Sequence, residues 1–350
     1  MNRNHPSSRL VVKKRKKKRI RRRVILAILI PIVVLFAGVA SYGAYLYSKA
    51  DDVISDSFED VSRDKSPLRD AEIDPSIDNV SILIIGVDEN DHRENQGNGL
   101  SDALMLATFN KGEKSIKLLS IPRDSLVYIP EVAREDKINH AHAFGGPEAT
   151  IETVEYLLEI PVDYYVKLNF HAFVEVIDAL GGIEVEVPYE FTESNSMDKR
   201  DAIHLYPGKQ VLYGEEALAL ARTRKLDNDI ERGKRQQEIV KAVLKKTVSV
   251  GSVMNYDDVL EAVGNNMKTN MTFSDMKTFI SYAASGMNLD IETLTLEGQD
   301  YQPNGIYYYQ LDPYALSEVK STLQNHLELT TTVNSNTTPE VNASGSDISY

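Results

Sequence analysis

The apolar positions of the chain form short segments with two different periods. Residues 80–87 are an almost continuous apolar run, which is typical of a strand covered on both faces. Further strands are predicted at residues 103–108, 116–121, 164–168, 183–187 and 307–311. Apolar positions at helical spacing predict helices that begin near Pro147, Asn169, Gly214, Arg232, Thr272 and Asp312. This alternation predicts an α/β fold, a layered α-β-α sandwich with a mixed central sheet.

A longer uncharged segment stands near the N-terminus. Residues 24–47 are 24 residues without a charge, and about 20 apolar residues span a bilayer. Residues 1–23 contain twelve Lys and Arg residues and no acidic residue. By the positive-inside rule we predict a cytoplasmic basic segment at 1–23, one transmembrane helix at 24–47, and the remainder outside the cell.

Two alternatives exist for this N-terminal region. A cleaved signal peptide is one, but its apolar core is usually only about 7–15 residues long. A nucleic-acid-binding tail is the other, because basic runs bind phosphates. The position of the basic run directly before the apolar segment favours the membrane interpretation.

The outer part of the chain divides into three regions by composition. Residues 48–78 are polar and contain Pro67 and Pro75, which predicts an extracytoplasmic linker. Residues 79–329 contain all the predicted strands and helices and form one domain. Residues 330–350 are rich in Thr, Asn and Ser, which predicts a disordered tail.

The composition of the chain excludes several classes of covalent and metal site. The chain has no Cys, which excludes disulfides, Cys-ligated zinc, iron–sulfur clusters and a thiol nucleophile. The formal net charge is −13, and beyond residue 23 there are 27 basic against 52 acidic residues. His140 and His142 form an H-x-H pair, but no third zinc ligand stands at a convincing spacing. We therefore interpret both histidines as loop or pocket residues.

Cationic side chains gather at the start of the long helix. Arg232, Arg235 and Gln236 fall on the same side as its apolar stripe, where backbone N–H and guanidinium groups would hold an anion. Arg222 and Arg224 are two residues apart in a predicted extended segment, so both can face one phosphate. Pairing of these arginines with neighbouring carboxylates, or their exposure to solvent, is the open alternative.

Three more polar residues stand at the ends of predicted strands. Asp88 follows the first strand and Asp102 precedes the second, so the two carboxylates can share one Mg²⁺ ion that also takes phosphate oxygens. Arg123 follows the strand at 116–121, a position that ligand-binding residues favour in α/β sheets. The alternatives are turn or capping roles for the aspartates and a surface turn for Arg123.

Eight short motifs follow one another through this region. They are G-V-D at residues 86–88, L-S-D-A at 100–103, L-S-I-P-R-D at 119–124, D-K-I-N-H-A at 136–141, D-A-L-G-G at 178–182, G-E-E-A-L-A at 214–219, R-T-R at 222–224 and D-I-E-R-G-K-R-Q-Q at 229–237. Their order and their residues resemble those of the LytR–CpsA–Psr (LCP) proteins of Gram-positive bacteria. The resemblance covers residues 79–248 with motifs and includes the basic start and the single apolar span.

The resemblance implies a Mg²⁺-dependent phosphotransferase of cell wall assembly. Such an enzyme moves an anionic glycopolymer, for example wall teichoic acid, from a polyprenyl-pyrophosphate carrier to peptidoglycan. The implied metal ligands are Asp88 and Asp102. The expected pyrophosphate-binding residues are Arg123, Lys137, Arg222, Arg224, Asp229, Arg232, Arg235 and Gln236. The residues expected to be catalytic are Asp88, Arg123, Arg222 and Arg224.

The expected location is the cell membrane of a Gram-positive bacterium, as a single-pass type II protein with its domain outside. The expected partners are the lipid-linked glycopolymer, peptidoglycan and the membrane, but not nucleic acid, because only residues 1–23 would lie in the cytoplasm. Two other functions stay open. One is a hydrolase that splits polyprenyl pyrophosphates with water, and the other is a non-catalytic wall-binding or regulatory membrane protein. The glycopolymer could also be capsule instead of teichoic acid.

Overall fold

The computed structural model describes residues 57–88, 98–249, 267–284 and 290–329, together with Tyr45 and Ser48. The predicted basic segment at 1–23 and the predicted tail at 330–350 lie outside these residues, as does the predicted span at 24–47 apart from Tyr45. Among the described residues, no helix combines the length and the apolar character needed to cross a bilayer.

A mixed sheet of six strands forms the centre of the described domain, in the order β11-β6-β1-β2-β3-β12. The strands are β1 (Val80–Val87), β2 (Ser101–Asn110), β3 (Ser115–Ile121), β6 (Tyr164–Leu168), β11 (Met267–Thr269) and β12 (Asp290–Thr295). The pairs β1–β6 and β3–β12 are parallel, and the other neighbours are antiparallel. The prediction of an α/β fold with a mixed central sheet is therefore confirmed, although the sequence analysis missed β11 and β12.

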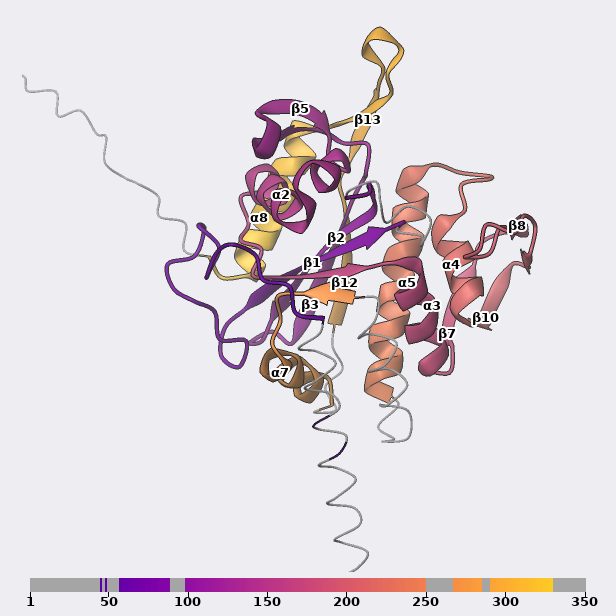
Figure 1. Ribbon diagram of the computed structural model, residues 1–350, viewed down its shortest axis with the longest axis horizontal. Coiled ribbons are helices and arrows are strands. Elements are labelled where there is room, and N and C mark those ends of the chain that lie inside the picture. Colours follow the sequence, from indigo (N-terminus) through magenta and orange to yellow (C-terminus); the bar gives the residue numbers. More distant parts are fainter. Residues whose placement is uncertain are drawn as a thin grey trace, which may run out of the picture.

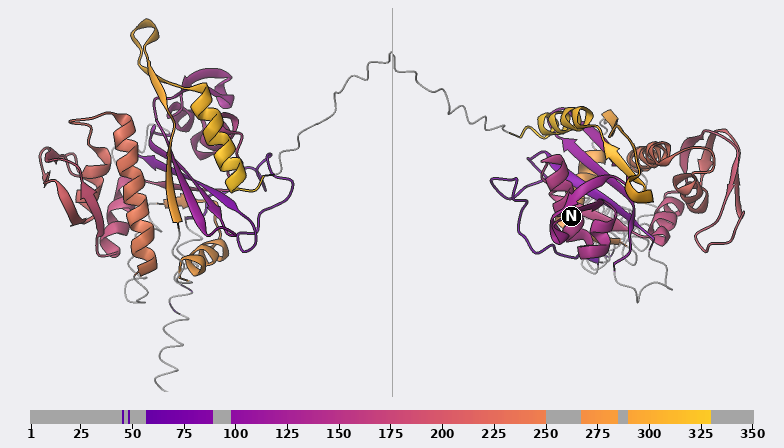
Figure 2. Two further views of the ribbon diagram at one scale, coloured as in Figure 1. Left: turned by 180° about the vertical axis from the view of Figure 1, so that it is seen from behind. Right: turned by 90° about the horizontal axis from the view of Figure 1, so that it is seen from above.

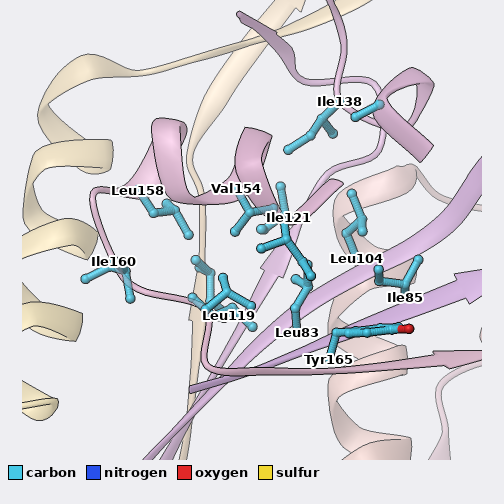
Figure 3. Packing of buried hydrophobic residues seen from close by; sticks show 14 of the residues in the cluster. Leu83, Ile85, Leu104, Leu119, Ile121, Ile138, Val154, Leu158, Ile160 and Tyr165 are labelled. Carbon is cyan, nitrogen blue, oxygen red and sulfur yellow. The ribbon is translucent and has the colours of Figure 1, made fainter. Parts of the chain in front are cut away.

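Helices cover both faces of this sheet (Figures 1 and 2). On one face lie α2 (His140–Leu158) and α8 (Pro313–His326), and on the other lie α5 (Asp229–Ser249) and α7 (Phe273–Ala284). Figure 3 shows Val154 and Leu158 directed from α2 toward the strands. Because both faces are buried, the apolar run in each central strand is continuous instead of alternating.

A smaller lobe packs against the side of α5 that faces away from α7 (Figure 1). It comprises α3 (Phe170–Ala179), β7 (Ile183–Val187), β8 (Phe191–Glu193), β9 (Ile203–Leu205), β10 (Gly208–Leu212) and α4 (Gly214–Arg222). Helix α3 begins next to Asn169 as predicted, and Asn169 caps it: its side chain accepts a hydrogen bond from the Ala172 amide at 2.9 Å. Gly214 is required because a Cβ there would lie 2.3 Å from the Val174 carbonyl oxygen. This contact brings α4 close to α3.

Two hairpins stand beyond the end of the sheet at which β1 and β3 finish. They are β4 (Leu126–Ile129) with β5 (Arg134–Lys137), joined by the 3-10 turn η1 (Pro130–Val132), and β13 (Gly298–Tyr301) with β14 (Tyr308–Leu311), joined across η3 (Pro303–Gly305). Figure 1 shows the second hairpin projecting from the domain near β5. The Tyr309 amide donates a 2.8 Å hydrogen bond to the Asp124 carbonyl, which fastens this hairpin to the segment after β3.

Residues 57–78, part of the predicted linker, pack along the domain. Arg63 Nη1 lies 2.6 Å from Glu155 Oε2, and Arg69 Nη2 lies 2.7 Å from Asp163 Oδ2. Val61 is buried in the same core as α2. Packing therefore starts before residue 79, which hydrophobic periodicity did not reveal because the segment anchors itself mainly through ion pairs.

His326 joins the end of α8 to the β2–β3 hairpin. Its Nδ1 lies 2.8 Å from Thr108 Oγ1, and its Nε2 lies 2.8 Å from Ser115 Oγ. Burial, followed by the charge of Lys117, lowers the pKa of His326 from its ordinary value of 6.5. The nearby carboxylates oppose this shift without cancelling it; they are Glu113, Glu292 and Glu328.

The lowered pKa predicts a pH-dependent stability. The unfolded chain binds a proton on His326 more readily than the folded protein, so the stabilisation is present above pH 6.5 and is lost as the pH falls through the lowered folded pKa. We expect the melting temperature of the wild-type protein to fall more steeply below pH 6.5 than that of His326→Gln, measured by scanning calorimetry. Parallel pH profiles for the two proteins would contradict this.

Candidate active site

A cavity of about 510 Å³, the first cavity, lies between the central sheet, α5 and the smaller lobe. One end is charged, because it is formed where β1 ends, β2 begins and α5 begins. Much of the remaining lining is apolar and comes from strands β1, β2 and β6 and from helices α3, α4 and α5; it includes Ile84, Met105, Leu168, Phe170, Phe173, Leu218, Ala221, Ile239 and Val240. The cavity therefore suits a ligand with a charged head and an apolar chain.

The strand ends bring two carboxylates to the charged end. The pairing of β1 with β2 shifts register between Gly86 and Val87, so Gly86 lies opposite Ala103 while Val87 lies opposite Ser101. A Cβ on Gly86 would lie 3.1 Å from the Ala103 Cβ, which shows how closely the strands approach there. Both Asp88 and Asp102 line the first cavity, as the positions of the predicted strand ends indicated.

The first turns of α5 supply two further residues. Asn228 caps this helix, and its Oδ1 accepts hydrogen bonds from the amides of Ile230 at 3.0 Å and Glu231 at 3.1 Å. Arg232 and Gln236 lie about one turn apart and both line the cavity. Gly233 faces β3, where a Cβ would lie 2.5 Å from Ser120 Oγ. The absence of a side chain at Gly233 lets α5 lie close to the sheet.

Asp229 lies at the centre of an ion-pair network with three arginines. Its carboxylate oxygens lie 3.4 Å from Arg123 Nε, 3.3 Å from Arg224 Nη1 and 3.5 Å from Arg232 Nη2. Burial works to raise the pKa of Asp229, but Arg232, Arg123 and Arg224 together bring it below the ordinary value. One carboxylate is thus shared among three guanidinium groups, of which Arg123 also contacts Asp102 and Asp124.

The pKa values of Arg123 and Arg232 are shifted in opposite directions at this site. Burial lowers the pKa of Arg232, which is only 7% exposed, and the attraction of Asp229 does not fully offset the combined effect of burial and its cationic neighbours. Burial also works to lower the pKa of Arg123, but Asp229 and Asp102 raise it on balance. Arg123 Nη1 donates a 2.6 Å hydrogen bond to Asp102 Oδ1, which connects the arginine cluster to the carboxylate pair.

Arg222 and Arg224 both line the first cavity, as the R-T-R motif predicted. The predicted extended segment is wrong for Arg222, which is the last residue of α4; the backbone is extended at Thr223, which is fully buried between the two arginines. The guanidinium carbon of Arg222 lies 4.8 Å from the centre of the Phe170 ring. This cation–π contact holds Arg222 at the cavity, while its N–H groups lie 3.4 Å from the Asn195 carbonyl oxygen and 3.6 Å from Asp198 Oδ1.

Arg235 is placed differently from the prediction and does not line the first cavity. Its guanidinium donates hydrogen bonds to the Asp227 carboxylate and to the carbonyls of Leu220 and Thr223. Successive helical residues differ in direction by about 100°, so Arg235 points away from Gln236 and toward the end of α4. Its position therefore assigns it a structural role.

Lys137 and Asp229 do not line the first cavity either. Lys137 Nζ donates a 2.7 Å hydrogen bond to Asp124 Oδ1 beside the rings of Tyr307 and Tyr308. Asp229 contacts the arginines of the first cavity, but its side chain borders a neighbouring cavity with Asp124. The structure therefore brings together Asp88, Asp102, Arg123, Arg222, Arg224, Arg232 and Gln236, with Lys137 and Asp229 just behind them.

Sequence reasoning missed several residues that line the first cavity. Lys225 and Glu193 stand at its charged end, and Lys225 directly follows the R-T-R motif, which is the one local signal for it. Phe170 and Phe173 of α3 also line it, and the sequence does not single them out, because a ligand-facing apolar position carries the same periodic pattern as a buried one.

The sequence profile of the LytR_cpsA_psr family matches residues 44–325. The chain belongs to this family. It is 40% identical over 306 residues to the polyisoprenyl-teichoic acid–peptidoglycan teichoic acid transferase TagT of Bacillus subtilis, covering 87% of this chain and 94% of TagT. It is also 40% identical over 296 residues to TagU of Halalkalibacterium halodurans, a transferase of the same description, covering 83% and 94% of the two chains. The resemblance drawn from the eight motifs is confirmed.

Solved structures of LCP proteins share the fold. TagT bound to LIIa-WTA superimposes with a TM-score of 0.66 at 40% identity, covering 76% of this chain and 97% of that chain. TagT with bound octaprenyl pyrophosphate lipid gives a TM-score of 0.62 at 38% identity, covering 76% and 98%. The described domain thus corresponds to nearly the whole of each solved LCP chain.

The placement of Arg235 predicts a loss of stability on its removal. Arg235→Ala would leave Asp227 and two carbonyl oxygens without this donor, and we expect the free energy of unfolding to fall by about 2–3 kcal/mol. Lys234→Ala is the matched control, because its side chain is 52% exposed and forms only a surface ion pair with Glu231. Thermal denaturation of both purified variants measures the difference. Equal stability of the two variants would contradict the structural role of Arg235.

Proposed function

We propose that this LCP protein is a glycopolymer–peptidoglycan phosphotransferase that acts in cell wall assembly. It transfers an anionic glycopolymer of the teichoic acid class from a polyprenyl-pyrophosphate carrier to peptidoglycan. The observation that carries the proposal is the first cavity, in which an apolar lining continues into a cluster of arginines and two carboxylates. The names of TagT and TagU and the ligands of the TagT structures support the same activity.

The apolar part of the first cavity provides the environment for a polyprenyl chain. Aliphatic and aromatic side chains line it from both sides, with Ile84 and Met105 from the sheet and Ile239 and Val240 from α5. Transfer of an isoprenoid chain from water to such a lining is favourable in proportion to the apolar area covered. The lipid therefore enters with its tail between the sheet and α5, and its headgroup stays at the charged end.

The arginines then bind the pyrophosphate. Arg222 and Arg224 approach from the smaller lobe, whereas Arg123 and Arg232 approach from the sheet and α5. Guanidinium groups donate paired hydrogen bonds to phosphate oxygens, and they stabilise the charge that develops as the phosphorus is attacked. Catalysis here is mainly positioning and charge stabilisation.

Asp88 and Asp102 provide a donor set that suits magnesium. Two carboxylates at one end of the cavity, with phosphate oxygens completing the shell, match the usual preference of Mg²⁺ for hard oxygen ligands. Bound magnesium would neutralise phosphate charge and make the phosphorus a better electrophile. The hydrogen bond from Arg123 does not occupy this donor set, because it reaches only one carboxylate oxygen of Asp102, at 2.6 Å.

The proposed transfer is a substitution at the glycopolymer-linked phosphorus. A peptidoglycan hydroxyl oxygen attacks this phosphorus, the bond from phosphorus to the bridging oxygen breaks, and polyprenyl phosphate leaves. The hydroxyl proton passes to a carboxylate, for which Asp88 at the first cavity and Asp124 beside Arg123 are the candidates. The arginine cluster stabilises the leaving phosphate throughout.

The location of this reaction is also part of the proposal. Residues 24–47 anchor the protein in the cell membrane as a single type II span, with the basic residues 1–23 in the cytoplasm. The first cavity then lies outside the cell, where lipid-linked polymer and peptidoglycan meet. A short distance from the membrane suits a substrate whose tail stays in the bilayer until it is bound.

Arg222→Ala and Arg224→Ala test the proposed role of the arginines. Each change should lower transfer of labelled polymer from a synthetic lipid carrier to peptidoglycan by about 10²–10³-fold, because a charge that stabilises the transition state is lost. Both side chains are partly exposed, at 27% and 50%, so the fold should survive. Lys209→Ala, on β10 and away from both cavities, serves as control. Normal transfer by both arginine variants would remove them from the mechanism.

The same assay separates transfer from hydrolysis. A phosphotransferase places the label on peptidoglycan, whereas a hydrolase releases labelled polymer into solution even when peptidoglycan is present. Release without any labelled peptidoglycan in the wild-type reaction would refute the proposed function.

Removal of magnesium gives a further prediction. A chelator should abolish transfer by the wild-type protein, and added Mg²⁺ should restore it, because the two carboxylates and the phosphates would otherwise repel one another. Asp88→Asn should raise the Mg²⁺ concentration needed for half-maximal transfer. Full activity in excess chelator would exclude the proposed metal role.

A further inference from the structure

A second cavity of about 330 Å³ lies next to the charged end of the first. The segment after β3, the start of α5 and the β13–β14 hairpin form it, so three distant parts of the sequence meet there. Its polar lining includes Asp124, Asp229, Gln299 and Asp300, and the ring of Tyr307 borders it. None of these residues except Asp229 was assigned to the pyrophosphate site.

A single layer of side chains separates the two cavities. Arg123 lines the first, whereas Asp124 and Asp229 line the second. Arg123 Nε lies 3.4 Å from Asp229 Oδ2 and 3.6 Å from Asp124 Oδ2. A ligand in the second cavity would therefore lie directly beside the group that contacts phosphate in the first.

The charge of the second cavity distinguishes it from the first. Its lining contains three carboxylates and no cationic side chain, so it offers phosphate no binding group, although Asp124 and Asp229 are paired with Lys137 and with arginines of the first cavity. Carboxylate and amide oxygens instead accept hydrogen bonds from hydroxyl and acetamido groups. Tyr307 is 37% exposed and offers a ring face against which a sugar can pack. The lining matches an uncharged, hydroxylated glycan.

Several contacts hold this lining in place before any ligand binds. Tyr307 Oη donates a 3.0 Å hydrogen bond to Asp300 Oδ1 across the hairpin. Lys137 Nζ lies 5.8 Å from the centres of both the Tyr307 and Tyr308 rings while it donates to Asp124. Burial, followed by the hydrogen bond to Asp300, raises the pKa of Tyr307 to about 12, so its hydroxyl stays protonated at neutral pH.

We propose that the second cavity binds the acceptor, a segment of the peptidoglycan glycan strand that presents an uncharged, hydroxylated face, and that Tyr307 and Asp300 bind it. This inference rests on the proposed phosphotransferase function. It places the acceptor glycan beside Arg123, whose other side faces the pyrophosphate in the first cavity. Because its lining has no cationic side chain, the second cavity offers no binding group to the anionic donor polymer.

Kinetics of Tyr307→Ala in the full-length protein test this assignment. With the lipid-linked donor saturating and glycan-strand oligomers varied, we expect the KM for the acceptor to rise about tenfold, the effect of losing one aromatic packing contact. The KM for the donor and kcat at saturating acceptor should stay unchanged. Asp300→Ala should behave in the same way, and it provides the test if Tyr307→Ala does not fold. Tyr314→Ala is the matched control, because Tyr314 is 87% exposed and lines neither cavity.

Direct binding provides a readout that does not depend on transfer. An uncharged N-acetylated oligosaccharide should bind the wild-type protein, bind Tyr307→Ala about tenfold more weakly, and stay bound when octaprenyl pyrophosphate fills the first cavity. Displacement of the oligosaccharide by this lipid, or a raised donor KM in Tyr307→Ala, would assign the second cavity to the donor sugars and overturn the inference. An unchanged acceptor KM in both variants would also overturn it. A wild-type protein that binds the oligosaccharide but transfers nothing would instead refute the proposed function.

Discussion

The whole site depends on the attraction between Asp229 and three arginines at the end of the central sheet. Arg123, Arg224 and Arg232 come from three segments and would repel one another without a shared counter-charge. Asp229 supplies this counter-charge to all three, and Asp102 and Asp124 add to it at Arg123, so the cluster forms without a ligand. A pyrophosphate bound in the first cavity would complete this charge balance. The fold therefore sets the arrangement of these charged groups, and the ligand is not needed for it.

The position of α5 connects this electrostatic cluster to the core. The same helix packs on β3 through Gly233, lines the apolar cavity with Ile239 and Val240, and presents Arg232 and Gln236 to the headgroup. On its other side Arg235 fixes the end of α4, which carries Arg222 into the cavity. Because one rigid helix carries residues for both parts of the cavity, it fixes where the pyrophosphate lies relative to the lipid tail.

Charge also separates the two substrates of the proposed reaction. The first cavity combines five cationic side chains and three carboxylates with an apolar lining, whereas the second has carboxylates and tyrosine rings but no cationic side chain. An anionic lipid-linked polymer and an uncharged glycan would therefore sort into different cavities. The ion pairs of Arg123 with Asp124 and Asp229 form the boundary at which the two would react.

The sequence by itself determined four of the six central strands, the helix start at Asn169 and, through the eight motifs, seven of the residues that line the first cavity. These features depend on local periodicity and on residue types at short spacing. Only the tertiary structure decided that Arg235 turns toward α4, that Phe170 faces the cavity, and that Tyr307 lies near Asp229. A periodic pattern reports which side of a helix is covered but not whether protein or ligand covers it. The second cavity depends on pairing between segments more than 60 residues apart, which no local pattern encodes.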